Sequence, residues 1–343
     1  MPFERPEPPA YRSVTVERIR RVDALRGFAV CGIMLVNTWQ RTAVGRDPSP
    51  FGWVMENLVQ SRFYPIFAFL FGLSFALFLG AARKRTARPR VVLLRRLAVL
   101  AVLGAAHTVV HPGGVLLPYA VLGVAVLLPA SLLPRWTVLL LGCGTLAAAL
   151  LGSEPYVLIT ALFLLGLAAA PSVADGVGGM GRTWVLAAVC AAAGALTAGL
   201  TWWWNHAPPG GGVYQAAAVS GAAAYAAAFL LLARRTALFE ALGRMALTNY
   251  VTGTLVIAVV PPRPSGGGSG AVVVGLTVVI LAAQAAFSRW WLARHRYGPL
   301  ERVWRTLTWW GEPPAGQTGS RDPHSAVPDP RRPRPEDQPR DRA

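Results

Sequence analysis

Apolar residues in this chain form long blocks that are separated by short polar and basic segments. Several of the blocks approach the roughly 20 residues that a helix needs to cross about 30 Å of hydrocarbon. The pattern predicts an all-α fold, a polytopic helical membrane protein with about ten transmembrane helices. The predicted spans lie at residues 24–40, 63–82, 91–110, 115–133, 136–152, 156–170, 183–204, 213–233, 244–262 and 270–288.

The basic residues between these spans alternate in density and so predict an orientation. One set of segments is rich in arginine: the N-terminus, residues 83–90 (RKRTARPR), Arg135, Arg182, Arg234 with Arg235, and the chain after Arg289. The opposite set carries only Arg41, Arg46, Arg62 and Arg263. Because cytoplasmic loops collect arginine and lysine, we expect both termini in the cytoplasm. The first span has no cleavage site after it and is expected to be retained rather than removed as a signal peptide.

The segments outside the spans differ in composition, which predicts three parts. Residues 1–21 are rich in proline and arginine and are expected to form a disordered or interfacial cytoplasmic segment. Residues 22–310 form a single transmembrane domain, and its last part, 289–310, combines tryptophan with arginine as interfacial segments do. Residues 311–343 contain almost no apolar side chains and are expected to be a disordered cytoplasmic tail.

Overall composition argues against a soluble or nucleic-acid-binding protein. The chain is 54% hydrophobic, its mean hydropathy is +0.43, and only 14% of its residues are charged. The net charge of +17 is confined to clusters between apolar runs and to the tail, so we expect membrane lipids and no nucleic acid as partners. The three cysteines lie in apolar runs without metal-ligand spacing, and no metal is expected. The composition leaves homo-oligomerisation open.

The run at residues 91–110, VVLLRRLAVLAVLGAAHTVV, holds the most informative polar residues of the chain. At 100° per residue, Arg96, His107 and the following His111 fall within a stripe of about 60° on one helix face. Arg96 and His107 would be about 16 Å apart along the helix axis. Ionisable side chains at membrane depth are costly and usually face a bundle interior or a water-filled cavity. This stripe predicts a polar site inside the membrane domain.

Each of these residues also has a structural interpretation. Arg95 and Arg96 point about 100° apart, so one of them is expected to face protein or a polar ligand while the other reaches the interface. For His107, a packing histidine with a hydrogen-bond partner and a functional histidine are about equally well supported. His107 and His111 are spaced as metal ligands on a helix, but no adjacent glutamate follows the HExxH pattern, and a zinc site is not expected.

The first span, RRVDALRGFAVCGIMLVNTW, carries a second polar group. Asp23 and Arg26 are three residues apart and can pair. Asn37 returns to within about 40° of the same face. The pair can equally be a helix-end carboxylate and an arginine that reaches lipid phosphates, and for Asn37 packing against another helix is favoured over catalysis.

Five segments in order resemble the YeiB-type membrane proteins, whose C-terminal half is catalogued as domain of unknown function 418. They are RVDALRGFAVCGIMLVN, FYPIFAFLFGLSFALFL, LLRRLAVLAVLGAAH with PGGVLLPYAVLG, GRMALTNY, and FSRWWLARHRYGPLERVWRTLTW. Together they cover most of the chain from about residue 18 to about residue 310. This family is similar to transmembrane acyltransferases of the heparan-glucosaminide N-acetyltransferase type.

The resemblance implies a membrane acyltransferase that takes an acyl group from cytosolic acyl-CoA to an envelope or small-molecule acceptor that the sequence does not identify. Arg26, Arg95 and Arg96 would then meet the phosphates of CoA. His107 would act as general base or acyl relay, and Asn37 would hydrogen-bond the carbonyl oxygen in the transition state. Asp23, His111 and Asn249 are the supporting residues. The implied location is the cytoplasmic membrane, crossed several times.

One position departs from the family pattern, and two other functions remain open. The family commonly has an acidic residue where this chain has Gly114, in PGGVL; if that carboxylate orients the histidine, another acid must replace it or the activity has drifted. The candidate acids are Asp23, Glu56 and Glu154. The same buried arginines and histidine would also suit a transporter or exporter of an anionic substrate, and a non-catalytic scaffold is the third alternative.

Overall fold

The computed structural model is helical throughout the residues it describes, apart from one pair of two-residue strands. The described residues are 10–44, 49–152, 154–175, 183–207, 211–233, 236–260, 263–264 and 269–310. The predicted tail, 311–343, and the first nine residues lie outside them. The strands β1 (Ala43–Val44) and β2 (Arg263–Pro264) pair in parallel and join the end of the first helix to the segment before the last long helix.

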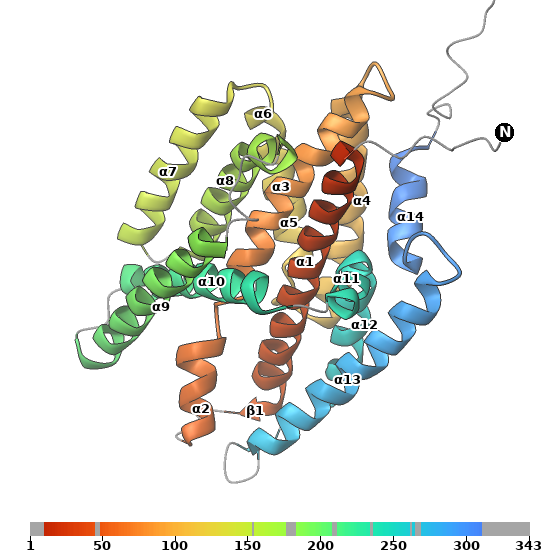
Figure 1. The fold of residues 1–343 in the computed structure, drawn as a ribbon. Helices are drawn as coiled ribbons and strands as arrows, with labels where there is room; N and C mark the ends of the chain where they lie inside the picture. Colours follow the sequence, from red (N-terminus) through yellow and green to blue (C-terminus); the bar gives the residue numbers. More distant parts are fainter. Residues whose placement is uncertain are drawn as a thin grey trace, which may run out of the picture. The chain divides into compact units, whose positions relative to one another are not determined.

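The helices follow one another with short connections (Figure 1). In chain order they are α1 (Ala10–Thr42), α2 (Pro50–Val54), the π-helix η1 (Met55–Val59), α3 (Tyr64–Arg83), α4 (Pro89–Val110), α5 (Leu116–Leu122), the π-helix η2 (Gly123–Leu127), α6 (Leu128–Ala130), α7 (Arg135–Leu151), α8 (Pro155–Asp175), α9 (Thr183–His206), α10 (Gly211–Leu232), α11 (Ala237–Arg244), α12 (Ala246–Ala258), α13 (Ser269–Leu292) and α14 (Pro299–Thr308).

Seven helical segments in the described part are long and apolar enough to cross a membrane. Three shorter apolar helices, Leu116–Ala130, Arg135–Leu151 and Ala246–Ala258, coincide with the other predicted spans. The class of a helical membrane protein with several spans is therefore confirmed.

Two boundaries differ from the sequence prediction. The first helix begins at Ala10, within the segment that was expected to be disordered or interfacial; the glutamate and arginines at residues 17–21 are good helix formers that precede the apolar span. The predicted span 244–262 corresponds to α12 (Ala246–Ala258), which begins after an interruption at Met245, where the backbone angles (φ −111°, ψ 30°) lie outside the helical region. The interruption separates α12 from the amphipathic α11, a short helix that precedes the predicted span.

Glycines allow two pairs of helices to touch at their backbones. A side chain at Gly72 of α3 or Gly166 of α8 would collide with the backbone carbonyl of the facing helix. Gly27 of α1 and Gly243 of α11 make the same kind of contact with each other's helix. Small residues at crossings are typical of membrane helices, since they let backbones approach and gain van der Waals contact.

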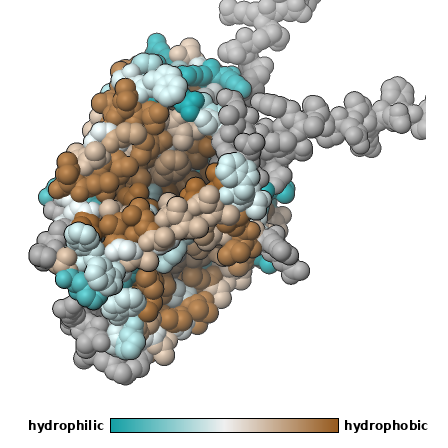
Figure 2. Space-filling model, turned by 60° about the vertical axis from the view of Figure 1, so that its left-hand side comes forward, coloured by the Kyte–Doolittle hydropathy of each residue, from teal (hydrophilic) through white to brown (hydrophobic). Residues whose placement is uncertain are grey.

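The surface of the molecule is apolar over α7 and α9. Figure 2 shows apolar residues gathered over the side that carries these helices. They include Trp136 and Leu140 of α7 and Trp184 and Leu196 of α9, all of which are exposed. Apolar surface of this extent is expected to face lipid rather than water.

Helices α3 and α4 define the two ends of the bundle. The loop at 84–88 joins them at the top of Figure 1 and carries Lys84, Arg85 and Arg88; we call this the basic end. Helix α3 finishes at this end and its 20 residues cover about 30 Å, with α2 and η1 lying beyond its first residue. His107 lies in the last turn of α4, near the end opposite the basic one.

Candidate functional site

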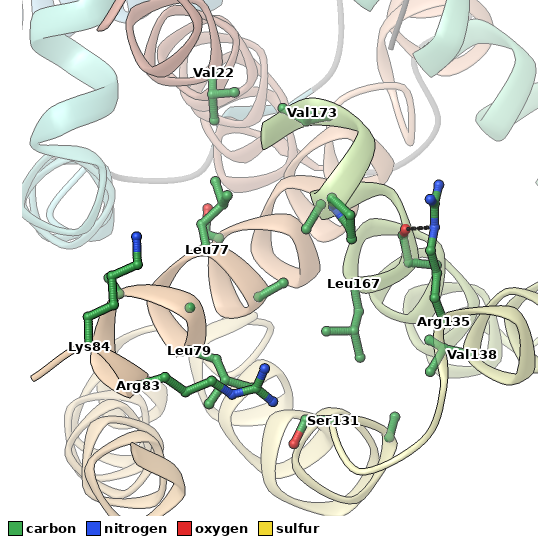
Figure 3. A pocket seen from close by; sticks show the side chains of 18 of the residues that line it. Val22, Leu77, Leu79, Arg83, Lys84, Ser131, Arg135, Val138, Leu167 and Val173 are labelled. Carbon is green, nitrogen blue, oxygen red and sulfur yellow. Dashed lines mark hydrogen bonds between the residues drawn. The ribbon is translucent and has the colours of Figure 1, made fainter. Parts of the chain in front are cut away.

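A wide cavity of about 950 Å³ opens at the basic end, between α1, α3, α7 and α8 (Figure 3). Its walls are largely apolar, with Leu79 of α3 and Leu167 of α8 among the side chains drawn. Its basic lining residues are Arg26, Arg83, Lys84, Arg85 and Arg135. Arg83 extends from the end of α3 into the cavity, on the side where Ser131 lies.

The basic groups of the wide cavity are held at different points of its rim. Arg135 is fixed by hydrogen bonds that it donates to the Ala168 carbonyl at 3.1 Å and to the Ser172 hydroxyl at 2.6 Å. Arg85 lies near the ring of Trp309, 6.0 Å from its centroid. Asp23 is the acidic residue that lines this cavity. The cationic groups outnumber it, so the rim favours an anionic ligand.

A narrower cavity of about 270 Å³ lies deeper, between α1, α3, α4, α12 and α14. Its walls are aromatic and aliphatic, and four arginines line it: Arg26, Arg96, Arg244 and Arg305. Its further polar residues are Ser74, Tyr119, Tyr250, Tyr297 and Glu301.

Arg26 joins the two cavities. Its Nη1 donates to Asp23 Oδ1 at 2.6 Å, and its Nη2 donates to the Ser74 hydroxyl on α3 at 2.7 Å. Arg26 and Ser74 line both the wide and the narrow cavity. The pairing of Asp23 with Arg26 that the spacing allows is therefore present, and it fixes the guanidinium at the boundary between two cavities.

Arg96 enters the narrow cavity, whereas its neighbour Arg95 does not. The Arg96 guanidinium carbon lies 3.7 Å from the ring centroid of Trp304 and 4.6 Å from that of Phe78. Arg95 is exposed and lines neither cavity. The sequence left open which of the two arginines faces protein, and the helix turn of about 100° between them sends only Arg96 inward.

Glu301 of α14 lines the narrow cavity near the basic end and connects α14 to α12. Its Oε1 accepts from the backbone N–H groups of Leu247 and Thr248, at 2.8 and 3.0 Å, and its Oε2 accepts from the Thr248 hydroxyl at 2.6 Å. These N–H groups belong to the first turn of α12, where a carboxylate is stabilised by the helix end. Burial raises the pKa of Glu301, and the hydrogen bonds from Thr248 oppose that rise.

His107 lies just behind the far wall of the narrow cavity. The His107 ring centroid is 5.2 Å from that of Tyr250, which lines the cavity, and 5.7 Å from that of His111. The Tyr250 hydroxyl accepts from the backbone N–H of Val115 at 3.3 Å. His107 is only 5% exposed, and neither ring nitrogen has a hydrogen-bond partner among the described residues.

Position 114 lies directly against this histidine. A Cβ added to Gly114 would come within 2.6 Å of His107 Nδ1. The acidic residue that the family commonly has at this position would therefore stand beside the ring, and here no side chain occupies that place. Burial, together with the charge of Arg41, lowers the pKa of His111 from its ordinary value, so that His111 is neutral at neutral pH.

The remaining residues suggested by the sequence lie outside the two cavities. Asn37 is half-buried on α1 and lines neither of them. Asn249 is buried, and its amide donates to the Leu242 carbonyl and to the Ser288 hydroxyl, both at 3.1 Å. These bonds connect α11, α12 and α13, so Asn249 acts as a packing residue that fixes the interruption at Met245.

Sequence reasoning did not identify several residues of the narrow cavity. Tyr250, Glu301 and Trp304 lie within the GRMALTNY and FSRWWLARHRYGPLERVWRTLTW segments, which were recognised only as family motifs. Their contacts join residues far apart in the chain, so no local sequence pattern predicts them. Among the residues that the structure describes, no group of three or more histidine, cysteine, aspartate or glutamate side chains is arranged to hold a metal ion.

The apolar surface and the membrane-length helices define a helical membrane protein, and two cavities inside it are lined in part by basic residues. Residues 174–311 match the model of the family described as Protein of unknown function (DUF418). The predicted resemblance to the DUF418 family is thereby confirmed over these residues.

Two curated relatives match part of the chain. It is 36% identical over 158 residues to the uncharacterized 39.9 kDa protein in the amylase 3′ region of Bacillus acidopullulyticus, over 45% of each chain. It is 28% identical over 141 residues to the uncharacterized protein YxaH of Bacillus subtilis (strain 168), over 36% of this chain and 35% of that one. The chain therefore spans less than half the length of either relative in these matches.

The family match covers one side of the narrow cavity. Arg244, Tyr250, Glu301 and Trp304 lie within residues 174–311, whereas Arg26, Arg96 and His107 lie before them. The cavity is thus built from both parts of the chain.

Proposed function

We propose that the protein is an integral-membrane acyltransferase that binds acyl-CoA from the basic end and transfers the acyl group to an acceptor at His107. The observation that carries this proposal is the shared wall of Arg26 and Ser74, through which a wide basic cavity adjoins a narrow, aromatic-walled one. Acyl-CoA has the same two parts, a nucleotide with several phosphates and a slender acyl-pantetheine arm.

The donor's phosphates suit the rim of the wide cavity. Arg83, Lys84 and Arg135 present cationic groups there, and arginine forms bidentate hydrogen bonds with phosphate oxygens. Arg26 and Arg96 would contact the donor further in. Arg95 has no place in this donor site, because it lines neither cavity.

The thioester end of the donor would lie near Tyr250. Tyr250 lines the narrow cavity and lies against His107, which also lies near the half-buried His111. A shift of the Tyr250 ring would bring a thioester against the imidazole. The unpartnered nitrogens of His107 are then available for proton transfer.

The reaction follows from this arrangement. An acceptor N–H or O–H attacks the thioester carbonyl carbon, a new C–N or C–O bond forms, and the C–S bond breaks. His107 takes the acceptor's proton and passes it to the departing CoA sulfur, so the thiol leaves neutral. The proposed oxyanion role of Asn37 needs a rearrangement of α1, since Asn37 lines neither cavity.

The location and topology complete the proposal. We place the protein in the cytoplasmic membrane, with the basic end and both termini in the cytoplasm, because arginine and lysine gather at that end. Ten crossings, in which the three shorter apolar helices also span, agree with this orientation. Membrane lipids are then its immediate partners.

Substitutions of the adjacent residues Arg95 and Arg96 test this proposal. Purified protein in detergent is titrated with acetyl-CoA and longer acyl-CoAs, with free CoA and ATP as comparison ligands, and its melting temperature is measured. We expect a saturable rise that Arg96→Ala weakens and Arg95→Ala leaves in place. His107→Ala should retain the rise and lose acyl transfer to acceptors.

Two results would contradict the proposal. One is a folded protein whose melting temperature responds to none of the CoA compounds. The other is an equal loss of binding in Arg95→Ala and Arg96→Ala, which would mean that general positive charge rather than the cavity is responsible. Either would favour the transport of an anionic substrate, to be measured as uptake into proteoliposomes.

A further inference from the structure

A second arginine is buried at the start of α3, away from the basic end. Arg62 follows η1 and precedes α3, and it is 2% exposed. Its Nη2 donates to the Asn57 carbonyl at 2.7 Å, while Nε and Nη1 have no hydrogen-bond partner among the described residues. A buried guanidinium with two unpartnered nitrogens is costly and requires an explanation.

No carboxylate compensates this charge within the described part of the chain. The titratable groups near Arg62 are the tyrosines Tyr64, Tyr214 and Tyr225, and none of them is a carboxylate. An isolated cation inside a membrane protein usually marks a ligand or ion site. The missing counter-charge therefore points to an anion from outside the chain.

The residues around Arg62 leave space for its buried side chain. Ser61 has a positive φ of 62°, which turns the chain between η1 and α3, and its hydroxyl accepts from Tyr214 at 2.8 Å. On α10, Gly221 faces the Arg62 side chain, and a Cβ there would lie 2.8 Å from Nε. Only a glycine fits at this position with Arg62 as placed.

Helix α9 adds further polar groups on the same side. A Cβ at Gly221 would also meet Thr197, and Asn205 donates to the Asn57 side chain at 2.8 Å. Thr201 lies between these two residues on one helix face, and its buried hydroxyl has no partner among the described residues. Thr201 can donate this hydroxyl to an oxygen of the same ligand.

We propose that Arg62, with Thr201 and the tyrosines around it, forms a second anion-binding site that takes a phosphate or carboxylate group. The fork of Nε and Nη1 suits two oxygens of one such group. The site lies at the start of α3, and Arg83 of the wide cavity lies at its end, about 30 Å away along the helix. The two basic sites therefore lie at opposite ends of α3.

This separation gives the second site a role in transfer. With the donor bound at the basic end, an acceptor that carries a phosphate or carboxylate would be held by Arg62 at the start of α3. That assignment to the acceptor rests on the proposed function, whereas binding of the anion does not. The test below omits acyl-CoA, so failure of one proposal can be told from failure of the other.

The experiment measures anion binding with Arg62→Met and, as a control, Arg302→Met, which removes an exposed arginine of α14. The melting temperature of each protein is followed against sodium phosphate and sodium acetate, with sodium chloride at equal ionic strength. Native mass spectrometry of the same samples detects retained phospholipid. Retention that depends on Arg62 identifies a lipid phosphate, and a saturable shift identifies a soluble anion.

We expect the wild type and Arg302→Met to show the shift or the retained lipid and Arg62→Met to show neither. Without added anion, Arg62→Met should melt at or above the wild-type temperature, because an unpaired charge has been removed. If Arg62→Met does not fold, Arg62→Lys, which keeps the charge without the fork, should weaken binding at least tenfold. The proposal is wrong if the wild type shows no anion shift and retains no phospholipid, or if Arg62→Lys binds as the wild type does.

Discussion

Arg96 and Trp304 are joined twice although 208 residues separate them. The Arg96 guanidinium carbon lies 3.7 Å from the Trp304 ring centroid, and the indole N–H donates to the Arg96 carbonyl at 2.7 Å. An aromatic face attracts the cation without neutralising it. The contact thus docks α14 on α4 while the charge of Arg96 remains available to a ligand in the narrow cavity.

Substitution of Trp304 should separate these two contributions. Trp304→Phe keeps an aromatic face and loses the indole hydrogen bond, so we expect a loss of about 1 kcal/mol in the free energy of unfolding. Trp304→Ala also removes the face and the buried ring, and a loss of about 2–4 kcal/mol is expected, with weaker acyl-CoA binding. Melting in detergent, with and without ligand, measures both effects.

Val303 supplies the control for Trp304. It is a largely exposed residue of the same helix, and Val303→Ala should change the stability little. Equal losses of stability in Val303→Ala and Trp304→Ala would show that both substitutions only destabilise helix α14. The stacking of Trp304 on Arg96 would then contribute nothing.

The close approach of α1 and α11 should make Gly243 intolerant of a methyl group. A Cβ at Gly243 would collide with the Asp23 carbonyl of α1. We expect Gly243→Ala to lower the free energy of unfolding by about 1–3 kcal/mol and to weaken donor binding, since Asp23 holds Arg26. Melting temperature and acyl-CoA titration measure the two effects.

Gly275 of α13 is the matched control, because no heavy atom lies within 4 Å of a Cβ built there. Gly275→Ala should leave stability unchanged or raise it by up to about 1 kcal/mol, as alanine favours a helix. If Gly243→Ala changed the stability no more than Gly275→Ala does, the close backbone contact between α1 and α11 would be contradicted.

The sequence predicted the membrane class, the approximate spans and the inward side of α4. These follow from apolar run length and from the 100° spacing of Arg96 and His107, which are local properties. It did not predict that Trp304 covers Arg96 or that Tyr250 lies against His107. Such contacts depend on which helices are neighbours, and a uniformly apolar helix surface carries little information about its partner. From the sequence, Arg62 was counted only as a charge on the external side. Its burial likewise depends on which helices are its neighbours and could not be predicted.

Glu301 predicts a pH dependence that Glu301→Gln should remove. Burial raises the pKa of Glu301 in the folded protein above the ordinary 4.5. As the pH rises from 4.5 through the folded pKa, the folded state keeps a proton that the unfolded chain has lost, so the stability contributed by this group declines. The wild-type melting temperature should therefore fall relative to that of Glu301→Gln over this window. A difference that stays constant, or moves in favour of the wild type as pH rises, would contradict the assignment.

Gly114 offers a gain-of-function test of His107. An aspartate at this position would place a carboxylate beside Nδ1, although the ring must give way slightly because a Cβ lies only 2.6 Å from that nitrogen. A carboxylate that accepts from Nδ1–H fixes the tautomer and leaves Nε2 free to take a proton. If His107 is the base, Gly114→Asp should raise acyl turnover about tenfold, with little change in acyl-CoA binding.

Gly114→Asn separates the carboxylate from the space that it fills, since the amide has nearly the same shape and no charge. We expect Gly114→Asn to lose some stability through the close contact and to gain no turnover, and Gly114→Asp combined with His107→Ala to be inactive. Turnover in Gly114→Asp at or below that of Gly114→Asn, in proteins that bind acyl-CoA equally, would show that His107 does not need an orienting acid. The glycine would then reflect a different use of the histidine in this protein.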